Sequence, residues 1–311
     1  MSMLSFFLLI IMVLIGVAFF TLMERKVLGY VHNRKGPNKV GYKGLFQPFS
    51  DVIKLFVKEV NFMKLMNLFF FLLIPFFSLI LMLLFWLVFY WHYGQVEMEY
   101  GLVFFLCISS LGIYVVFFGG WASNSKYSLL GSYRGLAQII SYEVSMAMLL
   151  IGLVIFSGSY SFIEISFFQE NYKIIWGFFS MLVVWLVTLL AETNRSPFDL
   201  SEGESELVSG FNIEFGSYGF ALLFMSEYGN IIYMSMITCL LFFGSLGFMC
   251  LYVVIVMYFF LLIRGTLVRY RYDKLMLMAW KSILPFSILF MMTLFYLKLF
   301  FISFCINFSK S

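Results

Sequence analysis

Long uncharged stretches dominate the chain, and short polar segments separate them. The stretches at 1–23, 65–95 and 100–125 contain no Asp, Glu, Lys or Arg, and each exceeds the roughly 20 residues that span the hydrocarbon of a bilayer. Later stretches follow the same pattern, although the run at 228–263 is too long for one helix. The pattern predicts eight transmembrane helices, at about 1–23, 68–92, 101–122, 136–160, 172–191, 219–243, 246–263 and 282–306. The expected fold class is therefore an all-α polytopic membrane protein, with one membrane domain over 1–311.

The polar segment at 24–67 contains a helical pattern of its own. Gln47, Asp51, Lys54 and Lys58 fall on one side of a helix, and Pro48 is tolerated because it lies in the first turn. We predict an amphipathic helix in the interface on the inner side of the membrane. The alternative is a basic loop that only anchors to anionic lipid. The apolar side of the predicted helix consists of Leu45, Phe46, Phe49, Ile53, Phe56, Val57 and Val60.

Composition supports the membrane assignment and excludes several kinds of site. Hydrophobic residues make up 63% of the chain, charged residues only 12%, and the mean hydropathy is +0.98, values outside the range of a soluble domain. No cleavable leader is expected at 1–23. His32 and His92 fall on opposite sides of the predicted topology, so they do not form a haem site. Each cysteine stands alone in an apolar stretch, so neither a disulfide framework nor an iron-sulfur or zinc site is expected; the four are Cys107, Cys239, Cys250 and Cys305.

The distribution of basic residues predicts the orientation. Of the 20 Lys and Arg residues, 17 fall in the alternate segments 24–67, 123–135, 192–218 and 264–281. The other side has only Lys173, Lys298 and Lys310. The positive-inside rule therefore places both termini outside and the charged segments inside.

The inside segment at 192–218 is acidic and contains Arg195 as its only basic residue. Glu202 and Glu206 are four residues apart, with Glu204 between them, so on a helix they would repel one another and the pKa of at least one carboxyl would rise. Coupled carboxylates with raised pKa values suit proton transfer near neutral pH. The alternative is a solvated acidic face.

Glu143 and Glu227 lie within predicted spans, where ionisable residues are expensive and mark functional sites. Both lie roughly 10–12 Å inside the membrane at 1.5 Å per residue. With Glu192 at the inner end of its span, they form a possible ladder for protons, although hydrogen-bonded structural glutamates remain the alternative. The outer halves contain almost no ionisable residue except Lys173 and Lys298. We therefore expect protons to leave sideways, into a partner subunit.

Six motifs resemble the NADH-ubiquinone oxidoreductase chain 1 family. They occur in order along nearly the whole chain: ERKVLGY at 24–30, RKGPNKVG at 34–41, SYEVS at 141–145, AETNRSPFD at 191–199, EGESELVSGFN at 202–212 and RYRYD at 269–273. The resemblance implies a core membrane subunit of respiratory complex I, the proton-translocating NADH:ubiquinone reductase. It also implies the mitochondrial inner membrane, with the charged segments in the matrix and both termini on the intermembrane-space side. The chain is expected to hold no redox centre of its own, and ubiquinone is its expected substrate.

The resemblance also assigns roles to residues. The tunnel for ubiquinone would be lined by Glu24, Arg25, Arg34, Phe49, Asp51, Phe220, Phe224 and Arg271. A proton path would begin there and include Glu143, Glu192, Asp199, Glu202, Glu204, Glu206 and Glu227. Two arginines, Arg134 and Arg195, would balance the carboxylates. The implied partners are the quinone-site subunits of the peripheral arm, the small antiporter-like membrane subunits beside the chain, and lipids, with no nucleic acid.

Three other functions are alternatives to a complex I subunit. A secondary transporter would contain inverted repeats and broken midplane helices, which the sequence does not indicate. A passive anchor for a redox arm would leave Glu143 and Glu227 unexplained. The equivalent, quinone-free subunit of a membrane-bound hydrogenase shares the expected fold, and sensitivity to ubiquinone-site inhibitors would distinguish it.

Overall fold

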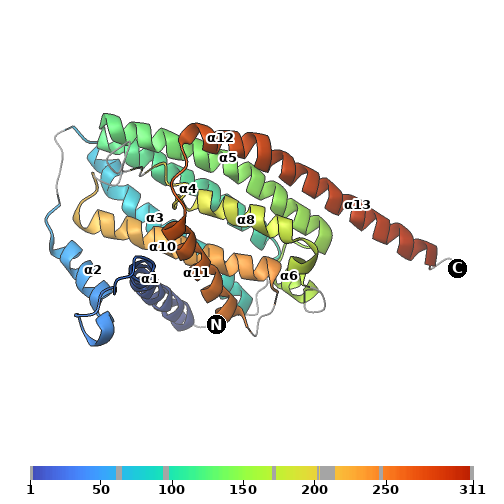
Figure 1. Cartoon of the computed structure of the whole chain (residues 1–311), viewed down its shortest axis with the longest axis horizontal. Coiled ribbons are helices and arrows are strands. Elements are labelled where there is room, and N and C mark those ends of the chain that lie inside the picture. Colours follow the sequence, from blue (N-terminus) through green and yellow to red (C-terminus); the bar gives the residue numbers. More distant parts are fainter. Residues whose placement is uncertain are drawn as a thin grey trace.

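A computed structural model describes residues 3–60, 65–93, 98–169, 173–201, 203, 214–244 and 248–308 (Figure 1). Within these ranges the chain is helical and contains no strand. The long helices are α1 (Met3–Val31), α3 (Leu68–Tyr93), α4 (Gly101–Ser123), α5 (Lys126–Ser157), α10 (Ser217–Phe242), α11 (Met249–Thr266) and α13 (Leu284–Phe308). The shorter ones are α2 (Gln47–Val57), α6 (Phe162–Phe168), α7 (Ile174–Gly177), α8 (Phe179–Glu192) and α12 (Tyr272–Met278), with a 3-10 turn at Tyr42–Gly44 and a π-helical segment at Ala279–Ile283.

The membrane-spanning character of the fold is confirmed. Seven helical runs in the described ranges are long and apolar enough to cross a bilayer. They comprise α1, α3, α4, α5, α10, α11 and the continuous run from α12 into α13. The fifth predicted span, 172–191, is present as two helices, because the chain breaks at Phe178 between α7 and α8. The 14 residues of α8 extend only about 21 Å at 1.5 Å per residue.

Several helix boundaries differ from the prediction. The segment at 126–135, predicted as part of a loop, is helical because Ser125 caps α5 by accepting a hydrogen bond from the backbone N–H of Ser128. Likewise Ser161 accepts from the N–H of Glu164 and begins α6, which the sequence did not predict. The last helical run begins at Tyr272 rather than 282. Serine caps thus begin α5 and α6 in sequence that hydropathy assigns to loops, whereas α12 begins without a side-chain cap.

α10 is the central element for the site. It packs against α1, α2 and α11 and also against α3, while α4 joins α3 to α5. In Figure 1, α1 and α2 lie on one side of α10, and α4, α5 and α13 lie on the other. Bulky side chains fill the interior between these helices, among them Trp185, Tyr233 and Phe105, which are fully buried. Consequently α10 can contribute side chains to spaces on both of its sides.

The predicted helix of the first inside segment is present as α2. It begins at Gln47 and contains Pro48 in its first turn, as expected. One face, including Asp51, points toward α1 and α10. The apolar residues that the sequence placed on the other side remain largely exposed, Val57 and Phe46 most of all. An exposed apolar face is what a helix in contact with lipid requires.

Candidate functional site

Two cavities flank α10. The α1–α2 cavity encloses about 880 Å³ of space between α1, α2 and α10. The α3–α4 cavity encloses about 840 Å³ between α3, α4, α10 and the segment that follows α8. Both volumes are open in part to their surroundings. Because neighbouring residues on a helix point about 100° apart, consecutive residues of α10 can face different cavities, and Glu227 and Tyr228 do so.

The α1–α2 cavity has mainly apolar walls with charges at one end. Its lining contains five of the eight residues that the resemblance assigned to a quinone tunnel: Glu24, Arg25, Asp51, Phe220 and Phe224. The rings of Phe220 and Phe224 lie 4.2 Å apart, one turn from each other on α10. Such walls suit a long hydrocarbon chain, and the charges suit a polar head.

The charges of this cavity are paired. Arg25 on α1 forms an ion pair with Asp51 on α2, at 2.5 Å between Nη1 and Oδ2. Gln47 Nε2 donates a second hydrogen bond to Asp51, at 2.9 Å. Glu24 is buried and forms an ion pair with Arg264 of α11. The polar end of the cavity is therefore built from opposite charges held by three helices.

Tyr228 connects the α1–α2 cavity to the interior on the other side of α10. Its side chain lines the cavity and interacts electrostatically with Glu24. The guanidinium of Arg195 lies over its ring, 4.5 Å from the centroid, a cation–π contact. A smaller space of about 280 Å³ is lined by Glu24, Arg195 and Arg264 among others. These groups form a continuous polar connection through the helix layer.

Arg195 extends this connection to the α3–α4 cavity. It is buried, and its Nη2 lies 3.1 Å from Oε2 of Glu227. Glu227 itself lines the α3–α4 cavity. Arg195 was predicted to balance carboxylates. It lies between Tyr228, which lines the α1–α2 cavity, and Glu227, which lines the α3–α4 cavity.

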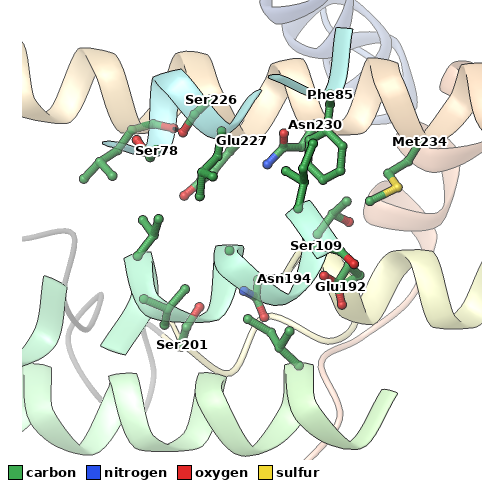
Figure 2. Close-up of a pocket in the computed structure, with 18 residues that line it drawn as sticks. Ser78, Phe85, Ser109, Glu192, Asn194, Ser201, Ser226, Glu227, Asn230 and Met234 are labelled. Carbon is green, nitrogen blue, oxygen red and sulfur yellow. Dashed lines mark hydrogen bonds between the residues drawn. The ribbon is translucent and has the colours of Figure 1, made fainter. Parts of the chain in front are cut away.

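Nine of the 18 residues that line the α3–α4 cavity have polar side chains (Figure 2). Glu227 and Asn230 extend into it from α10, and Glu192 faces them from the end of α8. No Lys or Arg lies in the lining that the described residues form. The remaining polar side chains in the lining are Ser78, Ser109, Thr193, Asn194, Ser201 and Ser226.

Three buried acceptor atoms in this wall have no hydrogen-bond partner among the described residues. They are Oε2 of Glu192, Oδ1 of Asn194 and Oδ1 of Asn230. Leaving a buried acceptor unpaired costs about 1–3 kcal/mol, so a cavity that concentrates such atoms is suited to water or to a transferable proton. Glu143 of α5 is not in the lining but interacts electrostatically with Glu192.

The segment between α8 and Ser201 holds this wall in place. Asp199 is buried and pairs with Arg269, at 3.3 Å. The ring of Phe198 stacks on Tyr270, with 5.6 Å between centroids, and the N–H of Tyr270 donates to the carbonyl of Pro197. The Ser196–Pro197 peptide bond is cis. The segment before α12 thus supports the one after α8.

The other predicted site residues lie elsewhere or outside the described part. Arg34 and Phe49 do not line the α1–α2 cavity; Arg34 is exposed, and the ring of Phe49 contacts that of Phe19. Arg271 is exposed beside Asp273. The guanidinium of Arg134 lies 5.9 Å from the ring centroid of Tyr272. Glu202, Glu204 and Glu206 lie outside the described residues, so the predicted acidic cluster stays a prediction.

Four residues of this arrangement were not predicted. Tyr228 and Asn230 lie beside Glu227 in an apolar helix. The sequence feature that could have indicated them is that both are polar residues within one helical turn of a glutamate inside a predicted span. Arg264 is a lone cation at the end of α11, and Arg269 belongs to the RYRYD motif. Within the described residues, no group of three or more His, Cys, Asp or Glu side chains is arranged to hold a metal ion.

Comparison with known proteins identifies the family. A family model described as NADH dehydrogenase matches residues 4–295. NADH-ubiquinone oxidoreductase chain 1 of Rhipicephalus sanguineus is 53% identical over 304 residues, covering 97% of both chains. The protein of that name from Aedes aegypti is 49% identical, covering 97% of this chain and 98% of its own. That from Balaenoptera physalus is 43% identical, covering 93% and 94%. The chain belongs to the NADH-ubiquinone oxidoreductase chain 1 family.

Proposed function

We propose that this chain is the membrane subunit of complex I that holds ubiquinone in the α1–α2 cavity and passes the effect of its reduction to the α3–α4 cavity. The observation that carries the proposal is the polar connection between the two cavities, from Glu24 through Tyr228 and Arg195 to Glu227. Family membership favours this function over a hydrogenase subunit, a transporter or a passive anchor.

The apolar part of the α1–α2 cavity suits the tail of a quinone, and its charged end suits the head. Phe220 and Phe224 supply aromatic walls for an isoprenoid chain, and Ala18 on α1 leaves room opposite them. Reduction of ubiquinone to ubiquinol takes up two electrons and two protons. The electrons come from a partner's redox centre in this proposal, while Glu24 and Asp51 influence the protons because they carry charge at the polar end.

The connection couples the two cavities electrostatically and does not require a continuous chain of hydrogen bonds. Glu24 is held by Arg264 and Tyr228, and Glu227 is held by Arg195. A change in the charge of Glu24 alters the field at Tyr228 and Arg195, and so the balance of protonation at Glu227, because charges act over longer distances in a low-dielectric interior. Glu192, on the far wall, then takes or releases a proton within the α3–α4 cavity. Protons leave from there into a neighbouring membrane subunit.

The expected setting is the mitochondrial inner membrane. α2 lies in the matrix-side interface with its apolar face in lipid, and the segments before α12 and after α8 face the peripheral arm. Both termini lie on the intermembrane-space side. This orientation is supported by the 17 basic residues in alternate segments.

The test is Glu192→Gln in the intact complex, reconstituted in proteoliposomes. NADH-to-ubiquinone turnover and proton uptake are recorded together, and assembly is checked on a native gel. We expect an assembled complex in which turnover and pumping fall in parallel. The matched control is Glu164→Gln, which removes an exposed carboxylate of α6 and should change neither. Normal pumping in Glu192→Gln would refute the proton path.

A further inference from the structure

A buried glutamine on α5 binds both ends of the segment that carries Glu192 and Arg195. Nε2 of Gln138 donates one hydrogen bond to the carbonyl of Ala191 and another to the carbonyl of Phe198, each at 2.8 Å. The side chain is fully buried. These contacts cross 53 and 60 residues of sequence, so they fix tertiary structure rather than a local turn.

Only an amide group fits this position among side chains of similar size. Two carbonyl oxygens converge on one atom, and a primary amide nitrogen supplies a separate N–H to each. A carboxylate would repel both oxygens, and a thioether or hydrocarbon would leave both unpaired in the interior, which is costly. The geometry therefore identifies the nitrogen, rather than Oε1, as the atom facing the two carbonyls.

The residues between the two anchored carbonyls are those that face the cavities. Glu192 and Asn194 line the α3–α4 cavity, and Arg195 pairs with Glu227. Short-range backbone hydrogen bonds inside the segment run from Asn194 to Ala191, from Arg195 to Leu190 and from Phe198 to Arg195, and the N–H of Tyr270 donates to the carbonyl of Pro197. None of these bonds sets the position of the segment against α5. The two bonds from Gln138 do so at both ends.

We propose that Gln138 is a positioning residue for proton coupling: by holding Ala191 and Phe198, it keeps Glu192 and Arg195 in register with Glu227. This inference rests on the proposed function of the α3–α4 cavity. Gln138 itself does not line either cavity, so it acts through the segment and not on the proton directly.

The chain contains a matched control for this inference. Gln169, after α6, is also buried, and its Nε2 donates to two consecutive carbonyls at the end of α10, those of Leu240 and Leu241, at 3.1 and 2.9 Å. Its position is outside both cavity linings. Replacing either glutamine by Met removes two hydrogen bonds from its amide nitrogen with little change in side-chain length. Only Gln138→Met releases the segment that contains Glu192.

The experiment compares Gln138→Met, Gln169→Met and Glu227→Gln in the intact complex in proteoliposomes. Turnover and proton uptake are measured per assembled complex, and hydrogen exchange is followed by mass spectrometry in the peptide covering 191–200. We expect Gln138→Met to speed exchange in that peptide and to lower both turnover and proton uptake about tenfold, within the roughly hundredfold loss that misplacing a reacting group by about 1 Å can cause. Gln169→Met should lower assembly at most and leave turnover and proton uptake per assembled complex unchanged.

The outcomes separate the two proposals. If Glu227→Gln lowers pumping but Gln138→Met does not, the proton path stands and the positioning role is refuted. If Glu227→Gln leaves pumping normal, the proposed function fails, and this inference fails with it. Should Gln138→Met not assemble, Gln138→Asn retains the amide on a side chain one methylene shorter, and normal pumping in that variant with faster exchange at 191–200 would overturn the inference.

Discussion

The two cavities beside α10 differ in how their charges are satisfied. In the α1–α2 cavity the charged groups meet partners of opposite sign, Asp51 with Arg25 and Glu24 with Arg264. In the α3–α4 cavity Glu227 pairs with Arg195, whereas acceptor atoms of Glu192 and Asn230 have no hydrogen-bond partner among the described residues. The unpaired acceptors therefore distinguish the second cavity from the first.

This difference suits two kinds of occupant. A cavity with balanced charges and aromatic walls accepts a largely apolar molecule without burying net charge. A cavity with unpaired acceptors favours water or protons, which satisfy them. Among the described residues, Tyr228, Arg195 and Glu227 form a polar layer between the two systems. Changes to this layer should therefore have the largest effects.

The strongest test of the comparison breaks the ion pair between the cavities. Arg195→Leu leaves Glu227 without the guanidinium, and removing one member of a buried pair costs about 3–5 kcal/mol. We expect almost no assembled complex on a native gel. Because replacing both members by apolar residues is often tolerated, Arg195→Leu combined with Glu227→Leu should restore assembly but not proton-coupled turnover. If the double variant also recovers turnover, the pair has only a structural role.

A second test fills the α1–α2 cavity from one wall. Ala18→Phe places a ring in the cavity that Phe224 also lines and should raise the KM for a long-tailed ubiquinone on the order of tenfold, equivalent to about 1.4 kcal/mol of binding. The KM for a short-tailed analogue should change less. Gly16→Phe is the control, because it adds the same ring to α1 outside the cavity lining and a Cβ there meets nothing within 4 Å. Equal effects of both variants on KM would contradict the assignment of this cavity to the tail.

The sequence predicts part of this comparison for clear physical reasons. Hydropathy located the spans, because burial of apolar surface in lipid requires them, and it marked Glu143 and Glu227 as unusual. It could not assign Glu227 and Tyr228 to different cavities, because that depends on which helices flank α10. The break at Phe178 was also missed, since no proline or charge marks it. The seven long spans thus follow from local sequence, whereas the pairing of charges follows from packing.

The third test separates unpaired acceptors from polarity in general within the α3–α4 cavity. Asn230→Leu removes a buried acceptor that has no described partner and should lower proton uptake about two- to tenfold, corresponding to roughly 0.5–1.5 kcal/mol for one hydrogen bond. Ser109→Ala is the control, since its hydroxyl donates to the carbonyl of Leu106 in its own helix, at 2.9 Å. It should change uptake by less than about twofold. An equal loss in both variants would mean that general polarity, and not the unpaired acceptor, matters.

The smallest effect is expected at the exposed ion pair beside the start of α12. Arg271 and Asp273 lie 3.1 Å apart with most of both side chains exposed, and such pairs contribute at most about 1 kcal/mol. Arg271→Ala should therefore leave the thermal stability of the complex nearly unchanged, in contrast to Arg264→Ala, which leaves the buried Glu24 without its partner. The KM for ubiquinone decides the role of Arg271. A large rise in the KM for ubiquinone at normal stability would indicate that a partner subunit completes the tunnel beside Arg271, as the family resemblance implies, whereas an unchanged KM would confine the site to the α1–α2 cavity.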